Sequence, residues 1–318
     1  MMEKNYKERI LVTGGAGFIG SNYLNHFVPK NKSTLFINVD VLTYAGNLKN
    51  INVSKEANYV FEKVDIRDKG ALQKVFRKYQ PTGVIHFAAE SHVDFSIKNP
   101  QIFLETNVIG TDNLLALSVK HKIKRFLLIS TDEVYGALSQ KDRSFEETDL
   151  LDPRSPYSAS KAGAEYLARA YANTFGLDVV TTRSSNNYGP NQDKSKVIPL
   201  FISNLLKGKK VPLYGKGLQV RDWLYVEDNV RAINLVWRKG KSGEVYNVGG
   251  NYELSNYDLT CKLLSLLGLG EEMIDYVKDR PGHDFRYSLN TDKIMKLGWK
   301  PEIFFSQGII RTLDFYKN

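Results

Sequence analysis

Short apolar runs alternate with longer amphipathic segments through the first part of the chain. The apolar runs that predict strands lie at residues 9–13, 35–39, 59–64, 84–87, 126–129 and 178–182. Helical spacing follows from the end of a glycine-rich run to about residue 28, and again at residues 69–79, 99–121 and 157–175. Strands that alternate with helices in this way predict an α/β fold built on a doubly wound parallel sheet.

This alternation breaks after Arg183, where residues 186–190 are typical of a loop. Beyond it we expect a helix at 197–206, extended segments at 211–214, 221–226 and 245–248, and a helix at 227–238. The remaining residues have weaker periodicity. We therefore expect residues 1–185 and 219–248 to form the main domain. Residues 186–218 and 249–318 would form a smaller domain interleaved with it.

A glycine-rich turn joins the first predicted strand to the first helix, with the sequence Gly14-Gly15-Ala16-Gly17-Phe18-Ile19-Gly20. Glycines let the backbone approach a pyrophosphate closely, and the N-terminus of the following helix supplies amide donors. Asp40 ends the second strand, where an acidic residue contacts the adenosine ribose in Rossmann-type sheets. The pattern predicts dinucleotide binding, and the carboxylate favours NAD over NADP.

Composition narrows the class of protein. The 318 residues carry a net charge of +9, but lysines and arginines are mixed with acidic residues along the chain. This distribution favours attraction of a small anionic ligand over nucleic acid binding. Cys261 is the only cysteine, so no internal disulfide can form. We expect a soluble cytoplasmic protein, without a membrane span. The five histidines lack the spacing of a metal site.

Two neighbouring acidic residues follow a predicted central strand, in the stretch Thr131-Asp132-Glu133. Ligands of open α/β sheets bind beyond the carboxyl ends of the strands, so these side chains should face a substrate. Mutual repulsion and unequal burial can separate the pKa values of two such groups, leaving one protonated and one ionised. A loop that carries acidic residues only for solubility is the simpler alternative.

Tyr157 and Lys161 lie four residues apart on one predicted helix and therefore share a face. Ser155 as N-cap and Pro156 at the first position would start this helix. An ammonium near a phenol favours the phenolate, so Tyr157 could take a proton from a sugar hydroxyl as hydride leaves the carbon. In isolation such a pair is common, and an ordinary tyrosine and lysine on an exposed helix face would be the better interpretation.

Together these features resemble the extended branch of the short-chain dehydrogenase/reductase family. Within that branch, seven stretches are similar to the dTDP-glucose 4,6-dehydratases, at residues 43–47, 88–94, 131–136, 157–161, 186–190, 221–228 and 279–283. Each stretch alone is weakly specific, but the combination spans nearly the whole chain. The resemblance therefore implies a hydro-lyase of deoxysugar biosynthesis, such as the synthesis of rhamnose.

The resemblance implies that dTDP-glucose is converted to dTDP-4-keto-6-deoxyglucose while NAD is recycled. Thr131 would hydrogen-bond near O4, and Tyr157 would remove the C4 hydroxyl proton. Glu133 would then remove the C5 proton, and Asp132 would protonate the departing C6 hydroxyl. Lys161 would contact the nicotinamide ribose. The main domain would hold NAD and the smaller domain the nucleotide sugar.

The same resemblance implies two sets of binding residues. The cofactor set is Gly14, Gly17, Phe18, Ile19, Gly20, Asp40, Thr43, Asp65, Ile66, Ala88, Ala89, Thr106, Tyr157, Lys161 and Asn187. The substrate set is Ser91, Thr131, Asn186, Lys196, Val197, Pro212, Tyr214, Arg221, Asn256, Arg280 and His283. Arg221 and Arg280 suit a diphosphate, and Tyr214 could stack on the base.

Several alternatives stay open. A 4-epimerase or decarboxylase on the same scaffold would keep Tyr157 and Lys161, but an epimerase has no need of the acidic pair. UDP-glucose or CDP-glucose could replace dTDP-glucose, and an NAD-sensing protein could lack catalysis. The chain departs from common family residues at Phe95, Asn229 and 194–196. Helices at 99–121 and 157–175 would pair across a homodimer.

Overall fold

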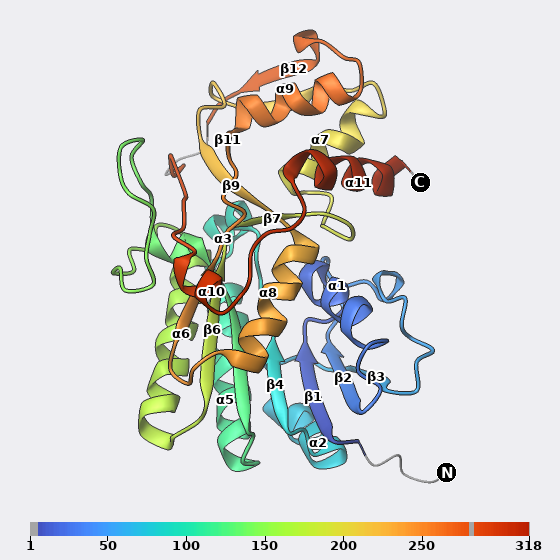
Figure 1. Ribbon diagram of the computed structural model, residues 1–318, viewed down its shortest axis with the longest axis vertical. Helices are drawn as coiled ribbons and strands as arrows, with labels where there is room; N and C mark the ends of the chain where they lie inside the picture. The colour runs from blue at the N-terminus through green and yellow to red at the C-terminus, as the bar shows by residue number, and fades with distance from the viewer. Residues whose placement is uncertain (1–5, 280–282, 318) are drawn as a thin grey trace.

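The computed structural model describes residues 6–279 and 283–317. A parallel sheet of seven strands, in the order β10-β6-β5-β4-β1-β2-β3, organises the larger part of the molecule (Figure 1). Its strands are β1 (Glu8–Thr13), β2 (Thr34–Asp40), β3 (Tyr59–Lys63), β4 (Gly83–His86), β5 (Arg125–Thr131), β6 (Val179–Ser184) and β10 (Val245–Val248). The strands predicted from the apolar runs are confirmed, and the fold is of the Rossmann type.

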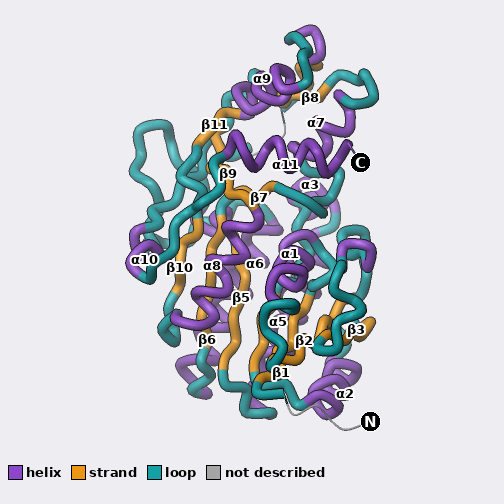
Figure 2. The backbone as a smooth tube through the Cα atoms, turned by 45° about the vertical axis from the view of Figure 1, so that its right-hand side comes forward, coloured by secondary structure: helices purple, strands orange, loops and turns teal. Residues whose placement is uncertain are grey.

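Both faces of this sheet are covered by helices, as the alternating apolar pattern requires. On β1, Ile10 and Val12 point to the cluster that holds α1 (Phe18–Phe27) and α8 (Val226–Lys239). Leu11 points to the opposite cluster, against α2 (Lys69–Tyr79), α5 (Gly110–Lys120) and α6 (Pro156–Phe175). Figure 2 shows the strands running between these helical layers.

A second region is built beyond the carboxyl ends of the strands (Figure 1). It contains a three-stranded sheet, β11-β9-β7, and a parallel pair, β12-β8. The strands are β7 (Asn186–Tyr188), β8 (Val211–Tyr214), β9 (Val220–Tyr225), β11 (Glu253–Ser255) and β12 (Ile274–Val277). The helices are α7 (Val197–Leu205), α9 (Asn256–Leu266) and α11 (Phe305–Lys317), whereas α10 (Asp292–Lys296) packs against β10, with Ile294 in the core of the large sheet. Residues of β9, α7, α9 and α11 share a separate apolar core.

Three details differ from the sequence-based expectations. The helix expected at 99–121 is divided into α4 (Pro100–Phe103), a π-helical segment η2 (Leu104–Ile109) and α5, preceded by α3 (Val93–Lys98). A π-turn inserts extra backbone without removing apolar residues, so periodicity does not reveal it.

The second difference lies at 186–190, where the expected loop contains the short strand β7, paired with β9. The third concerns residues 219–248. Helix α8 and strand β10 lie with the large sheet, whereas β9 belongs to the three-stranded sheet. Short 3₁₀ turns complete the described elements, η1 (Leu48–Asn50), η3 (Asp132–Tyr135) and η4 (Glu271–Met273).

Candidate active site

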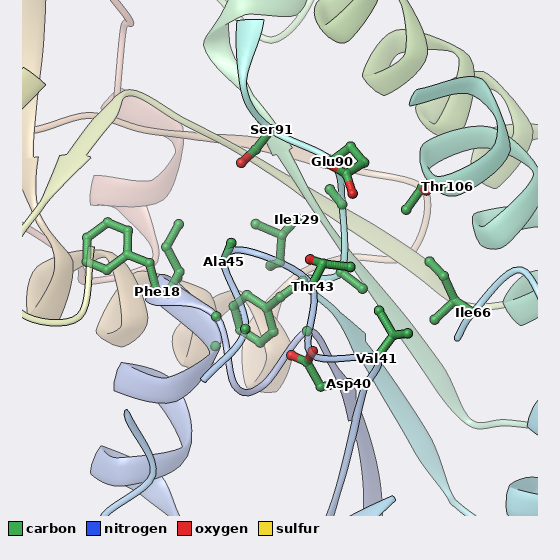
Figure 3. Close-up of a pocket in the computed structure, with 18 of the residues that line it drawn as sticks. Phe18, Asp40, Val41, Thr43, Ala45, Ile66, Glu90, Ser91, Thr106 and Ile129 are labelled. Carbon is green, nitrogen blue, oxygen red and sulfur yellow. The ribbon is translucent and has the colours of Figure 1, made fainter. Parts of the chain in front are cut away.

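A cavity opens where β1, β2 and β4 end and α1 begins (Figure 3). Its lining includes every residue of the predicted cofactor set except Asn187: Gly14, Gly17, Phe18, Ile19, Gly20, Asp40, Thr43, Asp65, Ile66, Ala88, Ala89, Thr106, Tyr157 and Lys161. We call this space the cofactor cavity. The side chain of Asn187 instead donates to the Ser185 carbonyl at 2.9 Å and accepts from Asn229 at 2.8 Å.

The glycines of the turn have distinct roles. Gly14 has φ +68°, and a Cβ there would lie 2.5 Å from the Ala88 nitrogen. A Cβ at Gly20 would lie 2.3 Å from the Gly14 carbonyl oxygen, so helix α1 packs on the turn only without it. Gly17 differs, because a Cβ there would come no closer than 3.3 Å to the protein. Gly17 lines the cavity, so the absence of a side chain there leaves space for a ligand.

Asp40 ends β2 as predicted, with its carboxylate in the cavity wall. It accepts from the amides of Ala16 at 2.9 Å and Leu42 at 2.8 Å. Burial raises its pKa, and these two amide bonds lower it. A carboxylate has about four lone-pair positions, so acceptor capacity remains for a diol. The glycine turn and this carboxylate fit the pyrophosphate and ribose of a dinucleotide.

Helix α6 begins where the sequence predicts. The Ser155 hydroxyl accepts from the Ser158 amide at 3.0 Å, with Pro156 at the first helical position. This start places Tyr157 and Lys161 in the cavity wall, both buried. The Lys161 ammonium donates to the carbonyl oxygen of Ile129 at 2.7 Å, and burial lowers its pKa to about 8.

The expected lowering of the Tyr157 pKa is not produced by the polypeptide alone. Burial raises that pKa, and the carboxylates of Glu133 and Asp132 raise it further, while a hydrogen bond with Thr131 acts in the opposite direction. The physical reason is that the phenol is buried and lies near the negative charge of Glu133, and both disfavour the phenolate. Positive charge from a bound cofactor would offset them.

The acidic pair lies at the end of β5, at the start of η3. The Thr131 hydroxyl accepts from the Glu133 amide at 3.3 Å and donates to Asp132 Oδ1 at 3.2 Å. Asp132 is only 3% exposed, and its Oδ2 has no hydrogen-bond partner among the described residues. Burial, followed by the charge of Glu133, raises the Asp132 pKa well above its usual range. Glu133 is half-buried, so the two environments differ as the sequence suggested.

A second cavity, which we call the sugar cavity, lies between the large sheet and the second region. Its lining includes Glu133 and most of the predicted substrate set: Asn186, Lys196, Val197, Pro212, Tyr214, Arg221, Asn256 and His283. Of the others, Ser91 lines the cofactor cavity, Thr131 contacts the acidic pair, and Arg280 lies outside the described residues.

Lys196 joins the two spaces, because it lines both cavities and its ammonium donates to the Ser91 carbonyl at 2.9 Å. Arg221 is held by backbone, donating to the carbonyls of Val220 at 2.7 Å and Asp284 at 3.0 Å. Its guanidinium also lies 4.3 Å from the centre of the Tyr287 ring. The rings of Tyr214 and His283 meet edge to face, with their centres 6.1 Å apart. The sugar cavity is therefore lined by cations and aromatic rings.

Sequence reasoning missed several lining residues. Trp223 and Tyr287 line the sugar cavity with His92. Trp223 lies two residues beyond Arg221 on β9, so the period of a strand places both on one face. Tyr44 and Glu90 line the cofactor cavity, inside stretches that the family resemblance covers. The resemblance was thus the available signal for them.

Within residues 6–279 and 283–317, no three histidine, cysteine, aspartate or glutamate side chains are grouped so that they could hold a metal ion. None of the helices found there combines the length and the apolar character needed to cross a membrane.

A doubly wound sheet, a glycine turn opening α1, an acidic end to β2 and a buried Tyr157–Lys161 pair together define the short-chain dehydrogenase/reductase class. The family model described as GDP-mannose 4,6 dehydratase matches residues 11–312. The dTDP-glucose 4,6-dehydratase of Shigella flexneri is 48% identical, over 97% of this chain and 92% of the relative.

Comparison with solved structures leads to the same family as the sequence comparison. The dTDP-glucose 4,6-dehydratase of Streptomyces venezuelae, solved with NAD bound, has a TM-score of 0.94 and 46% identity, over 97% of each chain. The dTDP-glucose 4,6-dehydratase of Bacillus anthracis, in complex with NAD, has a TM-score of 0.91 and 44% identity, over 98% of this chain and 96% of the other. The chain belongs to the family of the dTDP-glucose 4,6-dehydratases.

Proposed function

We propose that the protein converts dTDP-glucose to dTDP-4-keto-6-deoxyglucose and recycles NAD in each turnover. The observation that carries this proposal is the placement of the acidic pair. Asp132 and Glu133 follow β5 beside Tyr157, and Glu133 lines the sugar cavity while Tyr157 lines the cofactor cavity. An oxidising site and an acid–base pair therefore share one boundary. The family membership supports the same reaction.

The residues of the cofactor cavity would hold NAD. The glycine turn and the first turn of α1 would bind the pyrophosphate, Asp40 the adenosine ribose, and Lys161 the nicotinamide ribose. Bound NAD would supply the hydride chemistry, as acceptor of the C4 hydride and donor of the C6 hydride. Both structural neighbours described above were solved with NAD bound.

Tyr157 acts in the first half of the reaction by accepting the C4 hydroxyl proton. Burial and the charge of Glu133 raise its pKa, so formation of the phenolate that acts as base would depend on positive charge from the bound cofactor. Thr131, which hydrogen-bonds Tyr157 and Asp132, is placed to orient O4. The sugar then carries a 4-keto group, which acidifies the C5 proton.

The acidic pair acts in the second half. Glu133 takes the C5 proton, and Asp132 gives its proton to the C6 hydroxyl, which leaves as water. The raised pKa of Asp132 suits this role, because burial and the neighbouring charge of Glu133 favour the protonated acid that the step requires. Glu133 then returns a proton to C5. A proton passed from Tyr157 back to Asp132 restores the starting state.

The alternatives make weaker use of this site. A 4-epimerase needs Tyr157 and Lys161, but its reaction includes no loss of water and therefore gives the buried Asp132 no role. An NAD-sensing protein would need neither the acidic pair nor a sugar cavity lined by Arg221 and Lys196. The choice among dTDP-, UDP- and CDP-glucose depends on few base contacts, and the identity of the curated relatives favours dTDP.

Three further expectations belong to the proposal. We propose that residues 1–185 and 219–248 serve NAD, with β9 as a shared strand, while 186–218 and 249–318 serve the nucleotide sugar.

A homodimer is supported by exposed apolar side chains at Leu104 and Ile109 on η2 and at Tyr166 on α6. These two helices pack together, and light scattering tests the assembly. A cytoplasmic location is consistent with the single cysteine.

The proposal is tested by product identification. NAD-loaded protein is incubated in parallel with dTDP-, UDP- and CDP-glucose, and products are identified by mass spectrometry and NMR. The expected result is a 4-keto-6-deoxy sugar, formed fastest from dTDP-glucose. Binding of the nucleotide sugars without this product would contradict the dehydratase function. A C4 epimer as product would support the epimerase instead.

A further inference from the structure

The acidic pair and the Tyr157–Lys161 pair are carried by different elements. Asp132 and Glu133 lie on η3, a single 3₁₀ turn, whereas Tyr157 lies on α6. In the proposed reaction these groups act on neighbouring carbons of one sugar, and a misplacement of about 1 Å can cost about 100-fold in rate. Hydrogen bonds in a 3₁₀ turn are poorer than in an α-helix, and the Gly136 amide is 3.4 Å from the Glu133 carbonyl oxygen. Other elements therefore have to hold the turn in place.

Tyr135, the last residue of η3, connects the turn to its surroundings. It is buried, and its hydroxyl donates to Asn247 Oδ1 on β10 at 2.8 Å. Its ring stacks on that of Phe145, with the ring centres 4.8 Å apart and the planes at 11°. The side-chain nitrogen of Asn247 donates in turn to the Phe145 carbonyl at 3.0 Å. Tyr135, Asn247 and Phe145 thus hold one another in place.

Arg183 extends these contacts to α6. Its guanidinium carbon lies 4.6 Å from the centre of the Tyr135 ring. The same guanidinium donates to both carboxylate oxygens of Glu165, with a shortest bond of 2.6 Å. Glu165 follows Lys161 by four residues and Tyr157 by eight, so the three share the buried face of α6. A continuous series of contacts therefore joins the turn that carries the acidic pair to the helix that carries Tyr157 and Lys161.

Stability alone does not account for the ion pair between Arg183 and Glu165. Both side chains are only 6% exposed, and taking two such charges out of water costs about as much as their attraction returns. Apolar residues of similar volume at such positions often leave stability unchanged or raise it. The pair does, however, fix α6, β6 and the ring of Tyr135 in one arrangement.

Four side chains in this series, which we call the positioning network, are Tyr135, Asn247, Arg183 and Glu165. We propose that the positioning network holds the acidic pair in place relative to the start of α6. The inference rests on the proposed function, because it takes a sugar oxidised at C4 as the molecule on which the acidic pair acts. None of the four is among the described residues that line either cavity, so the network acts through η3 and not on the ligands.

The two halves of the reaction should depend on the network to different degrees. The start of α6 has supports of its own, in the Ser155 cap and in the bond from Lys161 to the Ile129 carbonyl. Loss of the network should therefore displace the acidic pair more than Tyr157, and water loss should slow more than C4 oxidation. Side chains that only stabilised the fold would change both steps, or the amount of active protein, by one common factor.

The test separates the two steps in a single turnover. NAD-loaded protein is mixed with dTDP-glucose, NADH absorbance is followed, and the 4-keto sugar and its dehydrated product are quantified after rapid quenching. Tyr135→Phe removes only the hydroxyl bond and should slow water loss about tenfold, with oxidation within about twofold of wild type. Arg183→Met combined with Glu165→Leu removes both charges and should slow water loss about 100-fold, with little change in melting temperature.

The matched controls lie outside the network. Tyr79→Phe removes a hydroxyl that is bonded to Glu62 at 2.6 Å. Arg125→Met combined with Asp178→Leu removes an ion pair at the opposite end of β5 and β6. Neither control should change the ratio of the two rates.

Two results would overturn the positioning network. One is an equal slowing of oxidation and water loss in the network variants, and the other is a wild-type rate for both steps. If the double variant does not fold, Tyr135→Phe decides between these outcomes alone. A wild-type protein that forms no dehydrated product would overturn the proposed function, and that failure is distinguishable because it needs no substitution.

Discussion

Backbone shapes the cofactor cavity, whereas side chains shape the sugar cavity. The first depends on bare glycines, on amides directed at Asp40 and on the ends of parallel strands. The second depends on Lys196, Arg221 and His283, which three separate segments bring together. A site shaped by the backbone should lose ligand affinity sharply when an added side chain fills part of its space. A site of the second kind should change gradually as single contacts are altered, and the acidic pair lies on the boundary between them.

The largest effect is expected at that boundary. Asp132→Asn and Glu133→Gln should each lower kcat by about 10³-fold, because each removes a general acid or base. Oxidation at C4 should survive better, so NADH absorbance should build up with dTDP-glucose. Asp152→Asn is the control, since that side chain is 75% exposed. Complete loss of hydride transfer in both variants would refute the division of labour.

Lys161 tests the buried side of the cofactor cavity. Its pKa is about 8 in the folded protein and 10.5 ordinarily. Between these values the unfolded chain binds more protons at this site, so the free energy of unfolding should rise with pH, by about 3 kcal/mol. Denaturant unfolding of the wild type and of Lys161→Met at pH values across this range measures how much Lys161 contributes to the pH dependence of stability.

In that comparison, the wild type should gain stability relative to Lys161→Met as pH rises. A variant of exposed Lys32, such as Lys32→Met, should follow the wild type. If the free energy of unfolding changed with pH equally in all three proteins, burial would not lower the pKa of Lys161.

Two glycines separate shape from stability within the cofactor cavity. Gly20→Ala forces a Cβ against the Gly14 carbonyl, so both the melting temperature and NAD affinity should fall. Gly17→Ala places its methyl group in ligand space, so NAD affinity should fall by about 1–3 kcal/mol with little change in melting temperature. Calorimetric titration with NAD and thermal unfolding provide the two readings. An equal loss of stability in both variants would contradict the assignment.

Arg221 should give the smallest effect and the gradual response expected of the sugar cavity. Arg221→Lys keeps the charge but loses the fork that holds the side chain to Val220 and Asp284. KM for dTDP-glucose should rise about tenfold, with NAD affinity unchanged. Arg311→Lys, at an exposed arginine, is the control. A parallel loss of NAD affinity would mean that the two cavities are not built independently.

Sequence predicted most of the cofactor cavity because its signals are local. The glycine turn, Asp40 and the Tyr157–Lys161 spacing are each read within one strand–helix unit, and the structure places them in one wall. The π-helical segment at 104–109 was not predicted, because one altered turn leaves the apolar pattern of the helix in place. The pairing of β7 with β9 and the contact of Lys196 with Ser91 join distant segments, which periodicity does not relate. The side-chain amide of Asn187 bonds Ser185 and Asn229, and its place in the cofactor set stays a prediction.

Lys196 is a member of both cavity walls, and its ammonium donates a hydrogen bond to the Ser91 carbonyl. A side chain that contacted both ligands and changed its interaction with one when the other bound would link the two occupancies thermodynamically. If a nucleotide sugar changes the affinity for the dinucleotide by some factor, the dinucleotide must change the affinity for the nucleotide sugar by the same factor. Half-loaded and fully loaded forms of the protein then differ in binding strength, and that difference is a property of the pair of ligands rather than of either alone.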